Sequence, residues 1–407
     1  MVATGSRLRA LACRECGRRV EPDLPVGTCP QCGSALLADY DLVGFDGPAW
    51  WSSLAGRPAT LWRYRELLPV RDGEQIVTLG EGFSPIVDLG RAGAGSEIHL
   101  SLKDDGGLPT GSFKARGMAV AVARARELGL RELFVPSAGN AGVALAAYGA
   151  RAGLTVRIYL PNRTPAPMRL ACAAYGAEVV SVPGTIRDAG EAARRAEAGR
   201  GSFDMSTLRE PYRAEGKKTM GLEIVEQCGP DGLPDVIVYP TGGGTGLVGM
   251  FKAFSELRSL GLLDRLPRLV SVQPEGCAPV VRALAENAPR VRPWDQPTTI
   301  APGLLVPAPF ASERVLEAVR ATGGTGVTVT DVEIRDAVAA LARRHGVSAS
   351  PEGAAPYAAV PRLIASGTVR PGMRVLLYNT GSGIPFVGSS PADDPVGEGP
   401  SGAAMTG

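Results

Sequence analysis

The stretch KDDGGLPTGSFKARG, residues 103–117, brings a lysine, Lys114, to the first turn of an expected helix after a turn-rich approach. The helix is expected because apolar residues recur at helical spacing over 113–128. The positive end of a helix dipole disfavours the ammonium form of a lysine, and a neutral amine is the nucleophile that Schiff-base chemistry requires. Since most surface lysines are simply solvated, the weight of Lys114 depends on its neighbours.

On both sides of this stretch, β-branched runs alternate with Ala-rich amphipathic runs. Such alternation predicts an α/β fold with a mostly parallel sheet and helices on both faces. The segment 287–311 is dense in proline and is expected to be irregular. The expected strands cover 75–79, 132–136, 155–160, 178–182, 235–240, 268–273, 326–330 and 374–379.

Three more glycine-rich loops directly follow expected strands. PSAGNAG at 136–142 supplies the side-chain amide of Asn140, and TGGGTGLVG at 241–249 supplies successive backbone amides to a phosphate at a helix start. YNTGSG at 378–383 supplies the hydroxyl of Thr380, which suits a neutral pyridine nitrogen. Each loop alone is an ordinary turn. Together they predict one ligand site, because open α/β sheets bind ligands at the carboxyl ends of their strands.

A second interpretation of the 241–249 loop is a dinucleotide site. Gly244, Gly246 and Gly249 match the Gly-x-Gly-x-x-Gly pattern, and Glu275 ends the next expected strand, where a ribose-binding acid is expected. That interpretation leaves the loop of Lys114 without a role. An NAD-binding oxidoreductase and a catalytically inactive scaffold remain alternatives from other classes.

Taken together, the motifs resemble the threonine synthase family of the fold-type II (tryptophan synthase β-like) pyridoxal-phosphate enzymes. TGSFKARG at 110–117 is similar to the family's Schiff-base motif, and LGEGFSP at 79–85 is similar to its segment ahead of the sheet. The resemblance implies that Lys114 carries pyridoxal 5'-phosphate and then moves protons, that Asn140 contacts the phenolic oxygen, and that Thr380 faces the ring nitrogen. It further implies that the cofactor phosphate is held by Gly242, Gly243, Gly244, Thr245 and Gly246.

The resemblance also implies an activity and a substrate site. The family converts O-phosphohomoserine and water to threonine and phosphate, and Ser137 and Arg213 match positions that it uses for the substrate phosphate. The chain departs from the family where Ala141 replaces a hydroxyl residue and Ser382 a histidine. These departures keep open a related enzyme that performs β-elimination or β-replacement on O-phosphoserine, O-acetylserine, serine or threonine.

Two Cys-x-x-Cys pairs lie near the N-terminus. Their four thiols have the composition of a tetrahedral structural zinc site, and a reducing compartment favours metal over disulfides. Four thiolates leave no open position for catalysis. The chain has only two histidines, so the sequence disfavours metal sites built from histidines and Ser-His-Asp catalytic triads. The expected zinc ligands are Cys13, Cys16, Cys29 and Cys32.

Composition and charge exclude several other classes. The chain of 407 residues has 43 Lys and Arg against 41 Asp and Glu, without the basic excess of a nucleic-acid binder. It has no apolar run of about 18 residues to span a membrane and no signal-peptide core. We therefore expect a cytoplasmic enzyme that acts on a small amino acid, with neither nucleic acid nor membrane as partner; the resemblance implies a homodimer.

The expected domains follow from the same patterns. A zinc-ribbon-like segment covers 1–45, and a large cofactor-binding α/β domain covers 46–120 and 225–390. A smaller mobile α/β domain covers 121–224 and closes over substrate. The Gly-, Ser- and Pro-rich tail, 391–407, is expected to be disordered.

Overall fold

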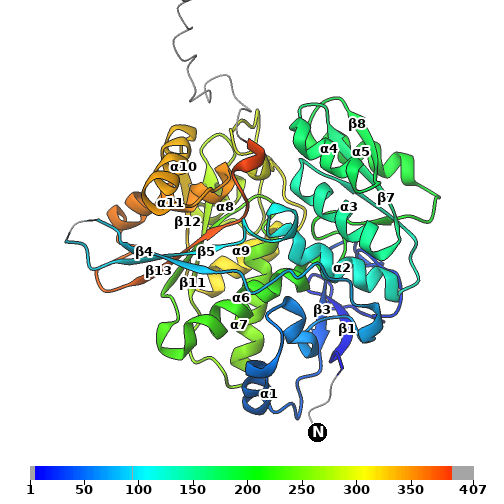
Figure 1. Cartoon of the computed structure of the whole chain (residues 1–407), viewed down its shortest axis with the longest axis horizontal. Coiled ribbons are helices and arrows are strands. Elements are labelled where there is room, and N and C mark those ends of the chain that lie inside the picture. Colours follow the sequence, from blue (N-terminus) through cyan, green and yellow to red (C-terminus); the bar gives the residue numbers. More distant parts are fainter. Residues whose placement is uncertain (1–4, 94, 387–407) are drawn as a thin grey trace, which may run out of the picture.

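The computed structural model describes residues 5–93 and 95–386. Its strands form three separate sheets of six, four and three strands, and helices pack around the two larger ones (Figure 1). This is the predicted α/β class. The predicted tail at 391–407 lies outside the described residues.

The six-stranded sheet has the order β12-β11-β10-β13-β5-β4. Its strands are parallel except for β4, which pairs antiparallel with β5 at the edge. The central strand β10 is buried along its whole length, which is typical of parallel sheets covered on both faces. The strands are β4 (Ile86–Arg91), β5 (His99–Asp104), β10 (Val236–Pro240), β11 (Arg268–Pro274), β12 (Gly326–Val329) and β13 (Arg374–Asn379).

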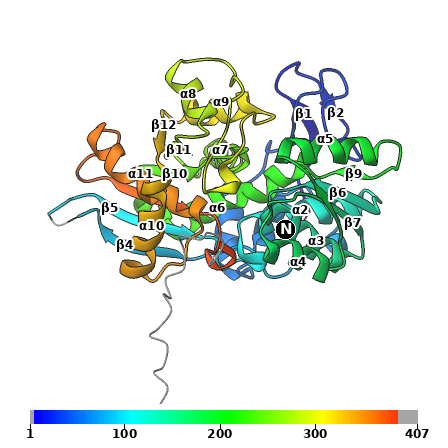
Figure 2. The same cartoon turned by 90° about the horizontal axis from the view of Figure 1, so that it is seen from above.

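The four-stranded sheet is parallel and has the order β8-β7-β6-β9. With α3, α4 and α5 it forms the lobe on the right of Figure 1. A third, antiparallel sheet of order β2-β1-β3 belongs to the N-terminal segment, and its strands β1 and β2 are labelled at the upper right of Figure 2. The strands of these two sheets are β6 (Glu132–Pro136), β7 (Thr155–Pro161), β8 (Glu178–Val182), β9 (Phe203–Asp204), β1 (Leu8–Cys13), β2 (Arg19–Val20) and β3 (Leu36–Tyr40).

Helices α2 and α6 connect the two larger sheets along the chain, and α7 follows β10 of the six-stranded sheet. Helix α6 packs against both α2 and α7, and the buried apolar side chains of α6 and α7 belong to one core cluster with those of β10. The helices are α1 (Gly47–Ser53), α2 (Lys114–Glu127), α3 (Asn140–Ala152), α4 (Ala166–Ala174), α5 (Ile186–Glu197), α6 (Tyr212–Gly232), α7 (Thr245–Ser259), α8 (Pro279–Ala285), α9 (Ser312–Ala321), α10 (Asp331–His345) and α11 (Pro351–Ala365). None of the helices in the described part of the chain has the length and apolar character needed to cross a bilayer.

One predicted strand is wrong. Residues 75–79 end the short 3₁₀ helix Gly73–Gln75 and then run extended without pairing. The buried carboxylate of Glu81 accepts hydrogen bonds from the backbone amide of Leu79 at 2.8 Å and from the hydroxyl of Thr78 at 3.1 Å. The backbone amide of Leu79 is therefore satisfied by a side chain and not by a neighbouring strand. The other expected strands coincide with observed strands within a residue or two, and 287–311 is irregular apart from the turn Pro302–Leu304.

The predicted domain limits at residues 120 and 224 fall inside α2 and α6. Both helices are continuous across these limits. If the chain is divided according to which sheet each segment belongs to, the boundaries fall in the loops that flank the two helices. The two-domain division and the mobility of the smaller lobe remain predictions.

Candidate active site

A cavity lies where the carboxyl ends of strands from the two larger sheets face each other. The loops that follow β5, β6, β10 and β13 all contribute to its wall, as the sequence predicted. The first and the last of these four loops begin more than 270 residues apart in the sequence. The predicted residues that line the cavity are Lys114, Ser137, Asn140, Gly242, Gly243, Gly244, Thr245, Gly246 and Thr380.

Lys114 begins α2 after a constrained turn. Thr110 has a φ of 64°, a left-handed conformation that is costly for a β-branched residue, and the turn brings the chain against the last strand. There the amide of Phe113 donates to the carbonyl oxygen of Thr380 at 3.0 Å. Residue Lys114 is therefore held directly beside the loop that follows β13.

The amine of Lys114 lies in an environment that favours its neutral form. Its Nζ lies 4.1 Å from the ring centre of Phe113. Burial and the nearby guanidinium of Arg213 lower the pKa of Lys114 to about 7, while the carboxylate of Glu352 opposes them. The amine is thus substantially deprotonated at neutral pH, which is what a nucleophile and proton carrier needs.

The glycine loop before α7 presents unpaired donors to the cavity. In the part of the chain that the structure describes, none of the backbone amides from Gly242 through Gly246 donates to a protein acceptor. Close packing explains the glycines: a Cβ at Gly242 would lie 2.3 Å from the carbonyl oxygen of Gly303, and one at Gly244, where φ is 74°, 2.2 Å from Val315. Free amides at a helix N-terminus form a suitable cradle for a phosphate.

Two other predicted cofactor contacts also lack protein partners. Among the described residues, neither the side-chain amide of Asn140 nor the hydroxyl of Thr380 forms a hydrogen bond with another residue. Ser137 differs, because its Oγ accepts from the amides of Gly139 at 3.0 Å and Gly142 at 2.9 Å and so shapes the loop. Its hydroxyl proton remains available to a ligand.

Arg213 does not line the cavity. Its side chain is buried behind the wall, where it donates to the carbonyl oxygen of Met205, and its Nε has no hydrogen-bond partner in the described structure. Its guanidinium nevertheless influences Lys114 electrostatically. The structure therefore places Ser137 in the wall of the cavity, whereas Arg213 acts on the site only through its charge.

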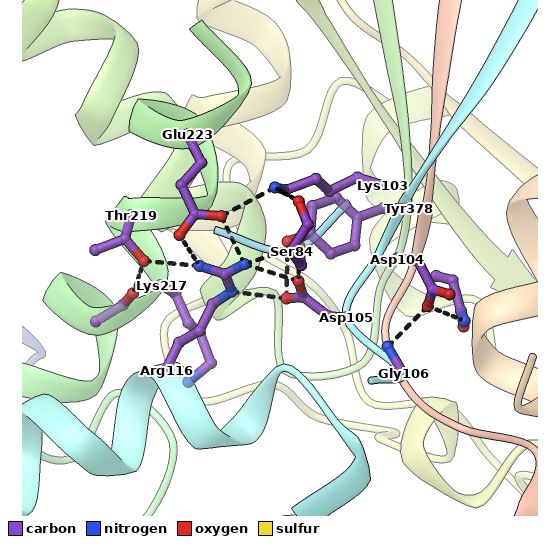
Figure 3. A network of polar contacts seen from close by, with 12 residues as sticks. Ser84, Lys103, Asp104, Asp105, Gly106, Arg116, Lys217, Thr219, Glu223 and Tyr378 are labelled. Atoms are coloured by element: carbon purple, nitrogen blue, oxygen red, sulfur yellow. Dashed lines mark hydrogen bonds and ion pairs between the residues drawn. The ribbon is translucent and has the colours of Figure 1, made fainter. Parts of the chain in front are cut away.

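A buried ion network fixes the start of α2 from behind. Figure 3 shows Arg116 between the carboxylates of Asp105 and Glu223, with Nε to Oδ2 of Asp105 and Nη2 to Oε2 of Glu223 both at 2.8 Å. Lys103 also donates to Glu223 at 2.9 Å, and Tyr378 to Asp105 at 2.8 Å. Burial alone would raise the pKa of Glu223, but Arg116 and Lys103 lower it to about 2. The two cations of this network thus balance its two anions. One of the cations, Arg116, lies two residues after Lys114.

Sequence reasoning missed several residues of the cavity wall. Glu352 in the first turn of α11, Tyr239 at the end of β10, and Thr207 all line it, together with the irregular segment 302–306. An acidic residue after a proline at a helix start is an ordinary feature of helix N-termini, so Glu352 carried no distinctive signal.

The four N-terminal cysteines come together as predicted. Their Sγ atoms all lie within 4.8 Å of one another, with Cys13 to Cys32 at 3.5 Å and Cys16 to Cys29 at 3.6 Å. Four thiolates bound to one zinc at about 2.3 Å lie about 3.8 Å apart in a tetrahedron, so the arrangement fits this ion.

The fold, the lysine and the phosphate cradle define a fold-type II pyridoxal-phosphate enzyme. In agreement, the family described as pyridoxal-phosphate dependent enzyme matches residues 77–381, and the chain belongs to this family. Within it, the chain is a member of the threonine synthases. It is 36% identical over 375 residues to the threonine synthase of Methanosarcina acetivorans, with 91% of each chain covered. It is 34% identical over 374 residues to that of Methanocaldococcus jannaschii, covering 91% of this chain and 92% of the relative.

Solved structures agree on the fold. Maize serine racemase superposes with a TM-score of 0.65 at 20% identity, covering 74% of this chain and 88% of the racemase. The dinucleotide alternative required Glu275 as the ribose-binding acid. Glu275 does not line the cavity and forms an ion pair with Arg362 at 2.8 Å instead. The family match thus favours the phosphate-cradle interpretation of the 241–249 loop.

Proposed function

We propose that this enzyme is a carbon-oxygen lyase that converts O-phosphohomoserine and water to threonine and phosphate. The observation that carries the proposal is that one cavity is lined both by Lys114 and by the loop Gly242 through Gly246, whose backbone amides are unpaired in the described structure. The similarity to threonine synthases over most of the chain supports the choice of substrate.

Each cofactor group has a partner in this proposal. Lys114 would bind the aldehyde carbon through a Schiff base, and the amides of Gly242–Gly246 would hold the phosphate. Asn140 would donate to the phenolic oxygen, and Thr380 would donate to the unprotonated ring nitrogen. When bound, pyridoxal phosphate supplies an electron sink for bond breaking at the substrate.

The protein's own residues position the substrate and move protons. Nζ of Lys114 would accept and return protons at the substrate carbons, as its lowered pKa allows. The hydroxyl of Ser137 would donate to a phosphate oxygen of the substrate, and the buried charge of Arg213 would favour that dianion. Lys114 would thus serve as both base and acid.

The deciding experiment incubates the holoenzyme with O-phosphohomoserine and measures threonine and phosphate release, with Lys114→Ala as the control. Wild type is expected to absorb visible light through the bound cofactor and to release both products in equal amounts, and the variant to do neither. A visible band without turnover would refute this substrate and direct the assay to O-phosphoserine, O-acetylserine, serine and threonine. Absence of the band would refute the role of Lys114.

We also propose that Cys13, Cys16, Cys29 and Cys32 bind a structural zinc ion, since all four ligand positions would be filled by thiolates. A homodimer in the cytoplasm is proposed from the family resemblance alone. Light scattering after size-exclusion chromatography would test the dimer.

A further inference from the structure

Glu352 carries the only carboxylate among the described residues that line the cavity. It lies in the first turn of α11, where Ser350 caps the helix by accepting from the amide of Gly353 at 3.2 Å. The residue as a whole is 6% exposed. A charge this deeply buried is costly unless it is paired, so its contacts decide its role.

The two oxygens of Glu352 have different environments. Oε1 accepts from the backbone amide of Gly303 at 2.7 Å, whereas Oε2 is buried without a hydrogen-bond partner in the described structure. An unsatisfied buried carboxylate oxygen costs several kcal/mol in general, so a donor is expected to reach it in the working enzyme.

Lys114 is the amine that shares the cavity with Glu352. The charged groups near Lys114 are Arg213 and Lys217 from α6 and Glu352 from α11, and the phenol of Tyr239 is the titratable group from β10. Burial lowers the pKa of Lys217 well below its ordinary value, and it raises the pKa of Tyr239, so that the phenol stays neutral near neutral pH. Arg213 and Glu352 act on the charge of Lys114 in opposite directions, since Arg213 disfavours the ammonium form and Glu352 favours it.

We propose that Glu352 is a positioning residue for proton transfer by Lys114, with Oε2 accepting a hydrogen bond from the ammonium that Lys114 forms during the reaction. The inference rests on the proposed function, in which Lys114 is a free base. In that step the substrate Cα–H bond breaks, its proton goes to Nζ, and its electron pair stays with the substrate and the bound cofactor. Glu352 stabilises the new positive charge, which burial and Arg213 disfavour.

A purely structural role for Glu352 makes a different prediction. The amide of Gly303 that Oε1 holds belongs to the segment whose carbonyl oxygen packs against Gly242 of the phosphate cradle. Glu352→Gln keeps an oxygen acceptor for Gly303 and removes the charge, whereas Glu352→Ala removes both. Glu352→Asp keeps the charge. Glu275→Gln removes a carboxylate that is 47% exposed, far from the cavity, and serves as the matched control.

The first measurement is made on protein from which the cofactor has been removed. Brief acylation with acetic anhydride across a pH series, read by mass spectrometry of the Lys114 peptide, reports the pH at which this amine is half deprotonated. We expect Glu352→Gln to lower that pH by about one unit, a tenfold change, as loss of a nearby opposite charge requires. Glu352→Asp is expected to stay near wild type, and Glu275→Gln to match it.

The second measurement uses the holoenzyme and threonine, and follows exchange of the Cα proton with deuterated water. The rising limb of the exchange rate is expected at lower pH in Glu352→Gln than in wild type, with a lower plateau. Unchanged profiles in Glu352→Gln, with weaker cofactor binding in Glu352→Ala, would overturn the proposal and leave Glu352 a purely structural role. Failure of the wild type to bind cofactor at Lys114 would instead refute the proposed function. The two failures can be told apart, because the acylation measurement is made without cofactor.

Discussion

At the scale of single residues, burial and charge decide the chemistry of this site. Lys114 and Lys217 are both near the ring of Phe113, with their Nζ atoms 4.1 Å and 5.4 Å from its centre. Only Lys114 reaches the cavity, while Lys217 is buried behind it. The same type of side chain therefore lines the cavity in one case and is buried structure in the other.

The depressed pKa of Lys114 predicts how cofactor binding depends on pH. Because the pKa is lowered from 10.5 to about 7, the reactive neutral form increases as pH rises through 7 and changes little above about 8. The rate at which cofactor-free protein takes up pyridoxal phosphate should therefore level off there, as measured by stopped-flow absorbance. Nα-acetyllysine, with its ordinary pKa, is the control. A protein rate that follows the control up to about pH 10 would contradict the assignment.

The ion network around Arg116 predicts a large loss of stability on truncation. Arg116→Ala leaves Asp105 and Glu223 buried with fewer partners, and removal of one member of a buried pair typically costs about 3–5 kcal/mol. Denaturant unfolding measures the change. Arg187→Ala, which removes a 78% exposed partner of Glu191, should change the free energy of unfolding by less than about 0.5 kcal/mol. Equal effects of the two substitutions would refute the role of the network.

At the scale of elements, loops at the carboxyl ends of parallel strands build the site. The glycine cradle between β10 and α7 depends on close contact with the segment 302–306, which belongs to the irregular excursion 287–311. Two segments about 60 residues apart thus shape one phosphate position.

This contact predicts the effect of a single methyl group. Gly242→Ala would place Cβ 2.3 Å from the backbone oxygen of Gly303, which has no flexible end that can move aside. We expect cofactor affinity to fall at least about tenfold, equivalent to about 1.4 kcal/mol, in equilibrium titrations followed by absorbance. Gly56→Ala, where a Cβ would meet nothing within 4 Å, is the control and should bind as wild type. Normal affinity in Gly242→Ala would show that the cradle tolerates displacement.

At the scale of the whole molecule, the N-terminal segment is tied to the catalytic body by buried polar contacts. Tyr40 of β3 donates to Glu215 of α6 at 2.9 Å, and Lys218 joins Glu215 to Glu256 of α7 at 2.8 Å each. Glu15, between two of the cysteines, pairs with Arg314 of α9 at 2.6 Å. The four-cysteine site is therefore part of the folded assembly and not an appendage.

Removal of metal should accordingly destabilise the enzyme without removing its cofactor. We expect about one zinc ion per chain by elemental analysis and a lower melting temperature after chelation or in Cys29→Ser, because ligand loss removes binding energy from the folded state. Cys228→Ser, which changes a partly buried cysteine outside the cluster, should keep the full zinc content. Zinc-free protein with an unchanged melting temperature would refute a structural metal.

Local sequence was sufficient for much of this molecule. The strand and helix alternation, the lysine at the start of α2 and the three glycine loops were all predicted, because each depends on short-range patterns of apolar spacing and turn residues. The cysteine cluster was predicted for the same reason, since metal-ligand spacing is a local property. The misplaced strand at 75–79 shows the limit, because this segment pairs with no strand and the amide of Leu79 donates instead to the buried carboxylate of Glu81.

Only the tertiary structure placed Arg213 behind the cavity wall and Glu352 in it. Arg116 likewise reaches Glu223 through the packing of α2 on α6, and it reaches Asp105 in the loop that follows β5. Burial and electrostatic pairing depend on distances in space between residues that are remote in sequence, and no local pattern encodes those distances. The sequence by itself therefore determined which groups are candidates for the chemistry, whereas tertiary packing decided which charges surround Lys114 and hence how readily it gains and loses its proton.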